Sequence, residues 1–237
     1  MPKIVDHSAR RDEIALVACR VVAEYGFDQA TVVRIAREAG YTTGMVAHYF
    51  DSKQEIILAA LRLNLRRIEE RLTRPAGTGA TLLEVLAESL PLDALRATEA
   101  AFWTAFWGQV SADKRLKRIN AWVHREYRRL YERCLIEHWP EWAGWSPELQ
   151  DEVLRAVVTF LNGLTAGAVI SAAEWPAERL LGQLSRQLEL WRAWAQAEAR
   201  ARTPALTPAH PESPTRTGTA GTVKSVRRAS RARAPGG

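Results

Sequence analysis

A run of short polar side chains between Thr42 and His48 carries the clearest chemical signal in this sequence of 237 residues. Threonine hydroxyls and a histidine imidazole can hydrogen-bond to base edges, and threonine and methionine methyl groups suit the methyl group of thymine. A glycine in the run would let the backbone come close to such a partner. The set consists of Thr42, Thr43, Gly44, Met45 and His48. We predict that these residues read bases in the major groove of double-stranded DNA.

Three further residues stand where helices are expected to start or end: Thr31, Tyr49 and Lys53. Such positions are suited to phosphate contacts, which fix a protein on the duplex without reading its sequence. Residues 1–53 hold seven basic and seven acidic side chains, so their net charge does not indicate DNA binding. The prediction depends instead on arrangement, and the partial positive charge of helix N-termini adds to it.

A second set of candidate residues is aromatic and lies in the C-terminal part of the chain, where all nine tryptophans are found. Ring faces attract a quaternary ammonium such as choline, and Glu99 or Glu126 could add a negative charge. An uncharged aromatic or acyl ligand would use the same rings, and an aromatic stripe at helical spacing is also typical of a core. The candidate ligand-binding residues are Trp103, Phe106, Trp107, Trp122, Tyr127 and Asn162.

Asn162 joins this set because it lies in an apolar, glycine- and alanine-rich helix, where a buried amide needs a ligand or a backbone partner. The five histidines show no metal-ligand spacing, and no glycine-rich phosphate loop, Ser-His-Asp grouping or pair of carboxylates stands out. The sequence therefore predicts no cofactor, no metal site and no enzyme active site.

The elements that must position these residues are helical throughout. Helical periodicity runs from Ser8 to about Arg200, and no segment alternates strictly between apolar and polar residues. We predict an all-α protein of about nine helices. A helix at about 8–25 precedes two short helices at 32–39 and about 42–50, where Ala36 is the small residue at the crossing and Gly40 allows the tight turn. This pattern favours a helix-turn-helix over an ordinary helical hairpin.

The rest of the chain predicts a helical bundle. Ser52–Glu55 and Thr81–Glu84 have the spacing of capping boxes. The first begins a long helix that ends before Pro75, and the second opens a series of five helices. These are expected at about 81–90, 93–110, 114–138, 147–172 and 177–200. The last two carry broad apolar rows that could form a four-helix interface between two copies, so we predict a homodimer.

The domains follow from these elements. Residues 1–53 form the predicted DNA-binding domain, residues 54–202 the ligand-binding and dimerisation domain, and residues 203–237 a disordered basic tail. The tail holds six basic residues and one acidic residue, and non-specific attraction to DNA is the alternative to a merely solvated segment. The two cysteines, the N-terminus without an apolar signal segment and the lack of a long uninterrupted apolar stretch predict a cytoplasmic protein with no membrane partner.

The N-terminal segment resembles the DNA-binding domain of the TetR family. The resemblance rests on the runs 31–40 and 43–50 with Lys53, and it extends to Gly26-Phe27 and Ala30-Thr31. It implies that Tyr49 and Lys53 meet phosphates and that exposed residues of the second short helix read bases. It also implies a dimer with a helical ligand-binding domain, in which the ligand spreads the two reading heads and releases DNA.

A narrower resemblance points to the BetI-type subgroup, whose repressors control genes that convert choline to glycine betaine. It rests on Met1-Pro2-Lys3, Thr43-Gly44 with His48-Tyr49-Phe50, the segment 103–107, and Asn162-Gly163-Leu164. The leading hypothesis is therefore a ligand-responsive repressor on a palindromic operator. The alternatives are an architectural DNA-binding protein without an effector and an enzyme on an all-helical scaffold.

Overall fold

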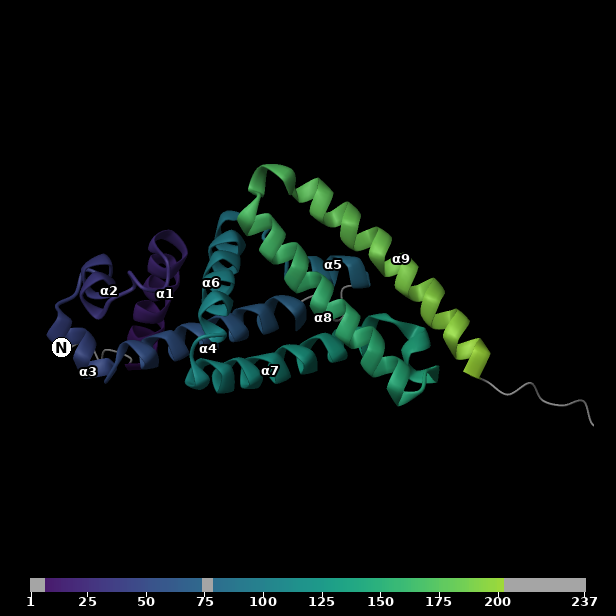
Figure 1. Ribbon diagram of the computed structural model, residues 1–237, viewed down its shortest axis with the longest axis horizontal. Coiled ribbons are helices and arrows are strands. Elements are labelled where there is room, and N and C mark those ends of the chain that lie inside the picture. The colour runs from purple at the N-terminus through teal and green to yellow at the C-terminus, as the bar shows by residue number, and fades with distance from the viewer. Residues whose placement is uncertain (1–6, 74–78, 203–237) are drawn as a thin grey trace, which may run out of the picture. The chain divides into compact units, whose positions relative to one another are not determined.

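The computed structural model describes residues 7–73 and 79–202, which belong to one compact unit. The regular elements in these ranges are nine α-helices and two short 3-10 helices, which confirms the all-α class (Figure 1). The α-helices are α1 (His7–Tyr25), α2 (Val32–Glu38), α3 (Thr43–Tyr49), α4 (Lys53–Thr73), α5 (Leu82–Ala87), α6 (Ala94–Val110), α7 (Lys114–His138), α8 (Pro147–Ile170) and α9 (Ala177–Arg202). The 3-10 helices, at Pro140–Gly144 and Ala172–Glu174, were not predicted. The tail at 203–237 lies outside the described residues.

Local capping explains where the three N-terminal helices, α1 to α3, begin and end, and we call these helices the head. Gly26 and Gly40 have φ angles of 81° and 71°, a left-handed conformation that ends the preceding helix at little steric cost. The hydroxyls of Thr31 and Thr42 accept hydrogen bonds from the backbone N–H groups of Arg34 and Met45 and so cap α2 and α3. The predicted helix-turn-helix is present.

The two predicted capping boxes differ in the structure. At Thr81 and Glu84 both reciprocal hydrogen bonds are present. At the start of α4, Ser52 Oγ accepts from the Glu55 N–H at 3.2 Å, but the Glu55 carboxylate accepts from the N–H of Asp51 instead of Ser52. The other Glu55 oxygen is held at 2.6 Å by Arg11 of α1, so a tertiary contact redirects the side chain.

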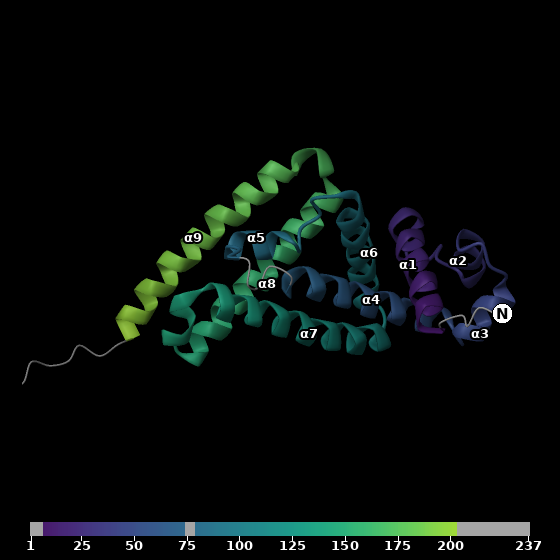
Figure 2. The same cartoon turned by 180° about the vertical axis from the view of Figure 1, so that it is seen from behind.

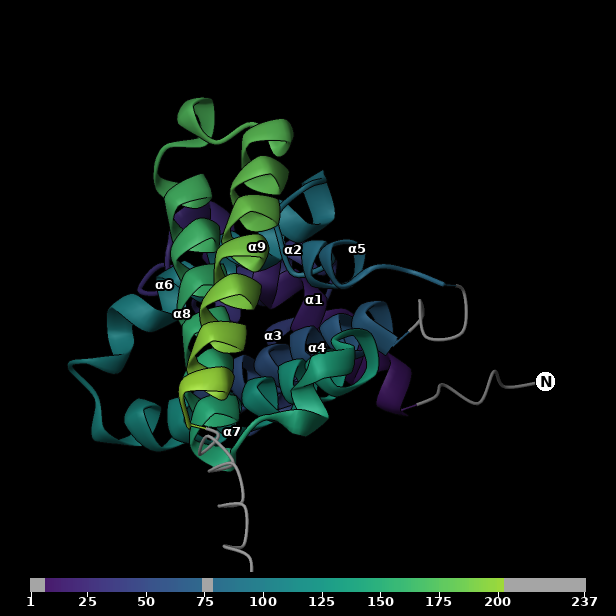
Figure 3. The same cartoon turned by 90° about the vertical axis from the view of Figure 1, so that its right-hand side faces the viewer.

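Helix α4 joins several parts of the fold. Helices α1, α7 and α5 contact α4, whereas α6 packs mainly against α1, α8 and α7 and is linked to α4 by the Arg71–Glu99 pair. Figure 2 shows α5 on the inner side of α9, which it contacts. Helices α8 and α9 lie side by side and are joined by the second 3-10 helix, so they run in opposite directions (Figure 3).

Two groups of buried apolar side chains hold the fold. The head cluster joins α1–α3 and the first half of α4 to Phe102, Trp103 and Phe106 of α6 and the start of α7. The body cluster joins the second half of α4 to α5, α8, α9 and the C-terminal half of α7. Since α4 contributes to both clusters, it connects the head mechanically to the rest of the protein. The division into domains at residue 53 stays a prediction.

Among the described helices, α8 is the one that is long and apolar enough, by length and composition, to cross a membrane. Nine of its side chains are buried, and they face α6, α7 and α9. These buried side chains make α8 part of the core of the described fold.

Candidate nucleic-acid interface and effector cavity

One side of α3 packs against the rest of the head, and the opposite side is exposed to solvent. Val46 is fully buried in the head cluster, and Phe50, which follows the helix, is 4% exposed. The opposite side of α3 exposes Thr42, Thr43, Gly44 and His48. Met45 is half-buried. The structure thus brings together on one surface most of the residues predicted to read bases.

Gly44 has no role that the fold itself requires. A β-carbon placed there would meet one atom within 4 Å, Thr42 Oγ1 at 3.9 Å, which is an ordinary contact. The chain would therefore tolerate a side chain at this position. The open surface above Gly44 is suited to close approach by a partner molecule.

Tyr49 lies at the end of α3 between two histidines. Its ring centroid is 4.7 Å from that of His7 and 5.2 Å from that of His48. Arg11 donates to the Tyr49 carbonyl oxygen and pairs with Glu55, so α1 and α4 together hold the C-terminal end of α3. His7 and Arg11 were not predicted as site residues, because neither lies within the helix-turn-helix pattern.

Lys53 is engaged inside the head. Its Nζ donates a hydrogen bond of 2.7 Å to the Phe27 carbonyl oxygen and lies 4.9 Å from the centre of the Phe27 ring. Partial burial lowers the pKa of Lys53, opposed by the negative charge of Asp28. An ammonium has three N–H donors, so a phosphate contact remains compatible with this bond. Thr31, the remaining predicted phosphate contact, is exposed.

A small cavity lies between α4, α6, α7 and α8, and we call it the central cavity. About 30 Å³ of it is open to the centres of water molecules, which is room for about two waters. Four of the six predicted ligand-binding residues line it: Trp103, Trp107, Tyr127 and Asn162. Burial raises the pKa of Tyr127 well above its ordinary value, so its hydroxyl stays protonated at neutral pH.

The structure does not bring Phe106 and Trp122 to the central cavity. Phe106 is fully buried in the head cluster and meets Trp103 edge-on at 6.0 Å. It points away from the cavity because one residue turns a helix by about 100°, which separates it from its neighbour Trp107. Trp122 lies on a surface groove between α4 and α7, with the Arg62 guanidinium 5.9 Å from its ring centre.

Charged residues also line the central cavity. Glu99 of α6 is buried and accepts a 2.7 Å hydrogen bond from Arg71 of α4. Arg67 lies one turn before Arg71 and approaches the same carboxylate at 3.5 Å. Of these three residues, only Glu99 was a candidate from the sequence. The i, i+4 spacing of the arginines on α4 was a signal that could have suggested a shared carboxylate. Glu126, the other carboxylate considered, lines the surface groove.

Within residues 7–73 and 79–202, no group of three or more histidine, cysteine or acidic side chains could hold a metal ion.

Comparison with family models gives two matches. Residues 14–60 match the model described as bacterial regulatory proteins, tetR family. Residues 79–193 match the model described as BetI-type transcriptional repressor, C-terminal. The first covers most of the head and the start of α4, and the second covers α5 to α8 and most of α9.

Two curated relatives illustrate the similarity. The regulator BetI of Burkholderia cenocepacia is 31% identical over 150 residues, which cover 58% of this chain and 72% of the relative. The regulator PksA of Bacillus subtilis is 33% identical over 110 residues, covering 45% of this chain and 54% of the relative. The match therefore spans about half the length of PksA.

Solved structures share the fold. A transcriptional regulator from Rhodococcus has a TM-score of 0.65 at 26% identity, covering 76% of this chain and 94% of that one. A regulator from Saccharomonospora viridis, solved in complex with choline, has a TM-score of 0.64 at 20% identity, with coverages of 77% and 96%. FadR of Bacillus subtilis, solved with stearoyl-CoA, has a TM-score of 0.56 at 18% identity, with coverages of 76% and 96%.

Proposed function

Because the chain belongs to the TetR family of bacterial regulators and carries a BetI-type C-terminal domain, we propose that it is a repressor that binds a palindromic operator as a homodimer. The family is one of DNA-binding transcriptional regulators and not of enzymes. Its site of action is the cytoplasm, where the operator DNA lies. Its effector is a small molecule with a quaternary ammonium group, such as choline, that enters the central cavity and releases the DNA.

The observation that carries the DNA-binding part is the geometry of α3. The helix is anchored by the buried Val46 and presents Thr43, Gly44 and His48 to solvent from its N-terminal half and outer side. A recognition helix contacts bases through such residues when it enters the major groove. Tyr49, Lys53 and Thr31 surround this surface in the roles of phosphate contacts.

Dimer formation is supported by apolar side chains on α8 and α9 that no described part of the chain covers. Ile170 at the end of α8 is 75% exposed, and Leu190 on α9 is 62% exposed. A shallow groove of about 400 Å³ between the two helices is lined by residues that include Phe160 and Trp191. Two such helices from each copy would bury these residues in a four-helix interface.

The proposed effector chemistry rests on the lining of the central cavity. Trp103, Trp107 and Tyr127 offer ring surfaces for an onium group, and Glu99 supplies the negative charge. The choline complex of the Saccharomonospora regulator is consistent with this chemistry on the same fold. A movement of α4 would couple ligand binding to the release of DNA, because this helix lines the cavity at Arg71 and belongs to the head cluster at Leu61.

An acyl effector is the second candidate, because FadR, which has the same fold, was solved with stearoyl-CoA. The small volume of the central cavity favours a compact ligand over a long acyl chain.

The test is a footprint of the purified protein on DNA from the region upstream of its own gene, repeated with choline and with an acyl-CoA. We expect a protected palindrome that choline removes. Protection removed only by acyl-CoA would overturn the ammonium assignment. Binding that prefers no sequence over random competitor DNA would overturn the operator function and favour an architectural role.

A further inference from the structure

The charged groups around the central cavity are balanced. Glu99 is paired with Arg71 at 2.7 Å and Arg67 at 3.5 Å, and all three side chains are at least two thirds buried. Arg96, which also lines the cavity, is held by Asp93 at 2.7 Å and by Glu88 at 3.2 Å. Three guanidinium groups thus share three carboxylates. A ligand that brings a net charge into this cavity would upset a balance that burial makes costly to lose.

The aromatic side of the cavity lies next to the charged side. Glu99, Trp103 and Trp107 follow one another at intervals of four residues on α6, so they lie along the same face of that helix. The Tyr127 ring of α7 meets the Trp103 ring at a centroid distance of 5.3 Å and an interplanar angle of 73°. An onium group among these rings would therefore be one helical turn from the Glu99 carboxylate.

The cavity is too small for a ligand in its present form. Its open volume of about 30 Å³ holds about two waters, and a quaternary ammonium compound such as choline is larger than that. A ligand can enter only by moving side chains apart. The Arg71–Glu99 pair joins α4 to α6 directly at the cavity wall, so its opening would both make space and move α4.

A simple cation would be a poor substitute for Arg71. If the ammonium group of such a cation paired with Glu99, the guanidinium of Arg71 would lose its main partner. The Arg71 side chain is only 15% exposed. An unpaired buried charge is strongly unfavourable. A ligand that also carries a carboxylate would return a partner to Arg71 at the same time.

We propose that the effector is a compact zwitterion, a quaternary ammonium joined to a carboxylate, which inserts between Arg71 and Glu99 and pairs with both. This inference rests on the proposed function and makes the effector class narrower. The onium group lies against Trp103 and Tyr127 beside Glu99, and the carboxylate accepts from the guanidinium of Arg71. Insertion separates α4 from α6 and so acts on the head.

Four probes of nearly equal shape test the proposal by tryptophan fluorescence or calorimetry on the full-length protein. They are trimethylglycine, choline, and the two compounds in which a neutral carbon atom replaces their quaternary nitrogen. These are 3,3-dimethylbutanoate, which matches trimethylglycine, and 3,3-dimethyl-1-butanol, which matches choline. We expect trimethylglycine to bind at least about tenfold more tightly than choline, which lacks the carboxylate that accepts a charge-assisted hydrogen bond from Arg71. We expect a similar margin over 3,3-dimethylbutanoate, which lacks the positive charge attracted by the rings and by Glu99. We expect 3,3-dimethyl-1-butanol to bind most weakly.

Other orders of affinity among the four probes would contradict the zwitterion proposal, the ammonium effector, or both. Choline binding as tightly as trimethylglycine would overturn the zwitterion proposal and leave the ammonium effector intact. Binding of 3,3-dimethylbutanoate as tight as that of trimethylglycine would overturn both, because the onium group would then contribute nothing. If none of the probes bound, both would also be overturned.

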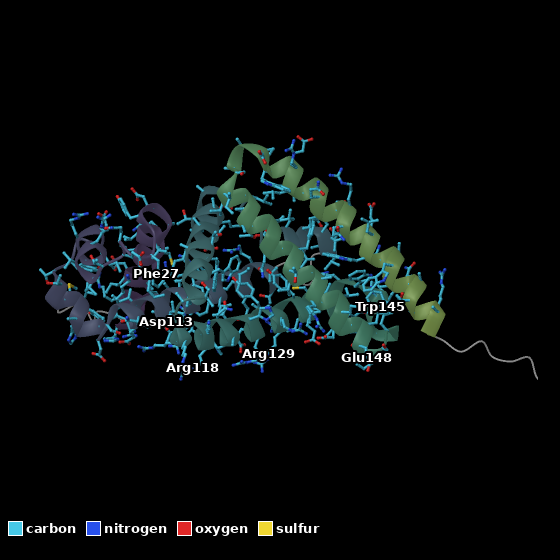
Figure 4. The ribbon with its side chains drawn as sticks, viewed as in Figure 1. Phe27, Asp113, Arg118, Arg129, Trp145 and Glu148 are labelled. Atoms are coloured by element: carbon cyan, nitrogen blue, oxygen red, sulfur yellow. The ribbon has the colours of Figure 1, made fainter. Side chains whose placement is uncertain are left out.

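A variant of Arg71 tests where the carboxylate end of the ligand binds. Arg71→Gln should reduce the affinity for trimethylglycine about tenfold and leave that for choline nearly unchanged, so that the ratio between them falls toward one. The matched control is Arg129→Gln, on the outer edge of α7, where the side chain is 70% exposed and faces away from the cavity (Figure 4). If Arg71→Gln kept the wild-type ratio, the carboxylate would not bind there and the proposal would be wrong. If the variant failed to fold, the four wild-type affinities would still decide.

Discussion

Lys53 at the start of α4 donates a 2.7 Å hydrogen bond to the carbonyl oxygen of Phe27, 26 residues earlier in the chain. The bond ties α4 to the turn between α1 and α2. A residue expected to meet a DNA phosphate is therefore also part of the packing that sets the angle of the head. The two roles have different experimental signatures.

Replacing Lys53 with alanine should weaken binding to every DNA sequence, because a phosphate contact carries no base information. The slope of log K against log salt concentration should fall by about one. The head should also lose ~1 kcal/mol of stability, since the Phe27 carbonyl loses its donor. Salt-dependent binding and urea unfolding measure the two effects. Lower stability with an unchanged salt slope would leave Lys53 with a structural role alone.

Changes on the outer side of α3 should alter sequence preference. We expect Thr43→Ala and His48→Ala each to reduce discrimination at one base position by about 1–3 kcal/mol, because each removes a contact to a base edge. Selection from randomised operators would measure the preference. Tyr49→Ala is the comparison, since it should weaken binding evenly across sequences. Identical preferences in wild type and both variants would contradict the assignment of α3.

Phe106 and Trp107 are adjacent on α6 and should behave differently. Phe106→Ala should destabilise the protein by about 3–5 kcal/mol, because the ring is fully buried in the head cluster. Trp107→Ala should destabilise less, since the ring is half-buried, and should abolish the response to effector while operator binding persists. Thermal unfolding and effector titrations on bound DNA separate these outcomes. A Trp107→Ala protein that responds normally would remove this residue from the effector site.

Leu190 tests the proposed dimer. Leu190→Glu places a charge on an apolar surface of α9 where the side chain is 62% exposed, so the isolated chain should fold normally. The dimer should dissociate at micromolar concentration, and operator affinity should fall because two linked heads bind more tightly than one. Sedimentation and operator titration give the answers, with Arg129→Glu on α7, where the side chain is 70% exposed, as the control for charge away from α8 and α9. A Leu190→Glu protein that remains dimeric would place the interface elsewhere.

Stability should fall in alkaline solution. Burial raises the pKa of both Cys19 and Cys134 from an ordinary value of 9.0 to about 12. The folded protein holds these protons over a range in which the unfolded chain has released them, so the associated stability is complete below about pH 9 and lost as the pH rises toward 12. Each thiol contributes at most about 1.4 kcal/mol per pH unit. Urea unfolding of wild type and Cys19→Ala should show a shallower decline in the variant.

Sequence reasoning recovered the elements that depend on local signals. The caps at Thr31 and Thr42 and the turn at Gly40 need only neighbouring residues, so the helix-turn-helix could be placed closely. The helices of the body were also predicted, because their apolar spacing repeats over many turns.

Contacts between distant segments were not predictable in the same way. Periodicity places Trp122 on an amphipathic helix but does not say that the groove beside it opens to solvent. It likewise gives Arg71 no special status, because its partner Glu99 lies 28 residues later on another helix. The aromatic members of the cavity could be named in advance, whereas its charged members needed the tertiary arrangement.

Trp103 belongs to two environments at once, since it lines the central cavity and is also buried in the head cluster. If this protein were redesigned as a sensor for a new compound, some residues of the cavity could therefore be substituted with less disturbance to the fold than others. A smaller residue at Trp103 would enlarge the cavity, but it would also loosen the packing of the head cluster, to which α3 contributes Val46. The affinity for the operator would then change even without ligand. Trp107 is absent from the buried core and can be varied with less disturbance, which makes it the better starting point for engineering specificity.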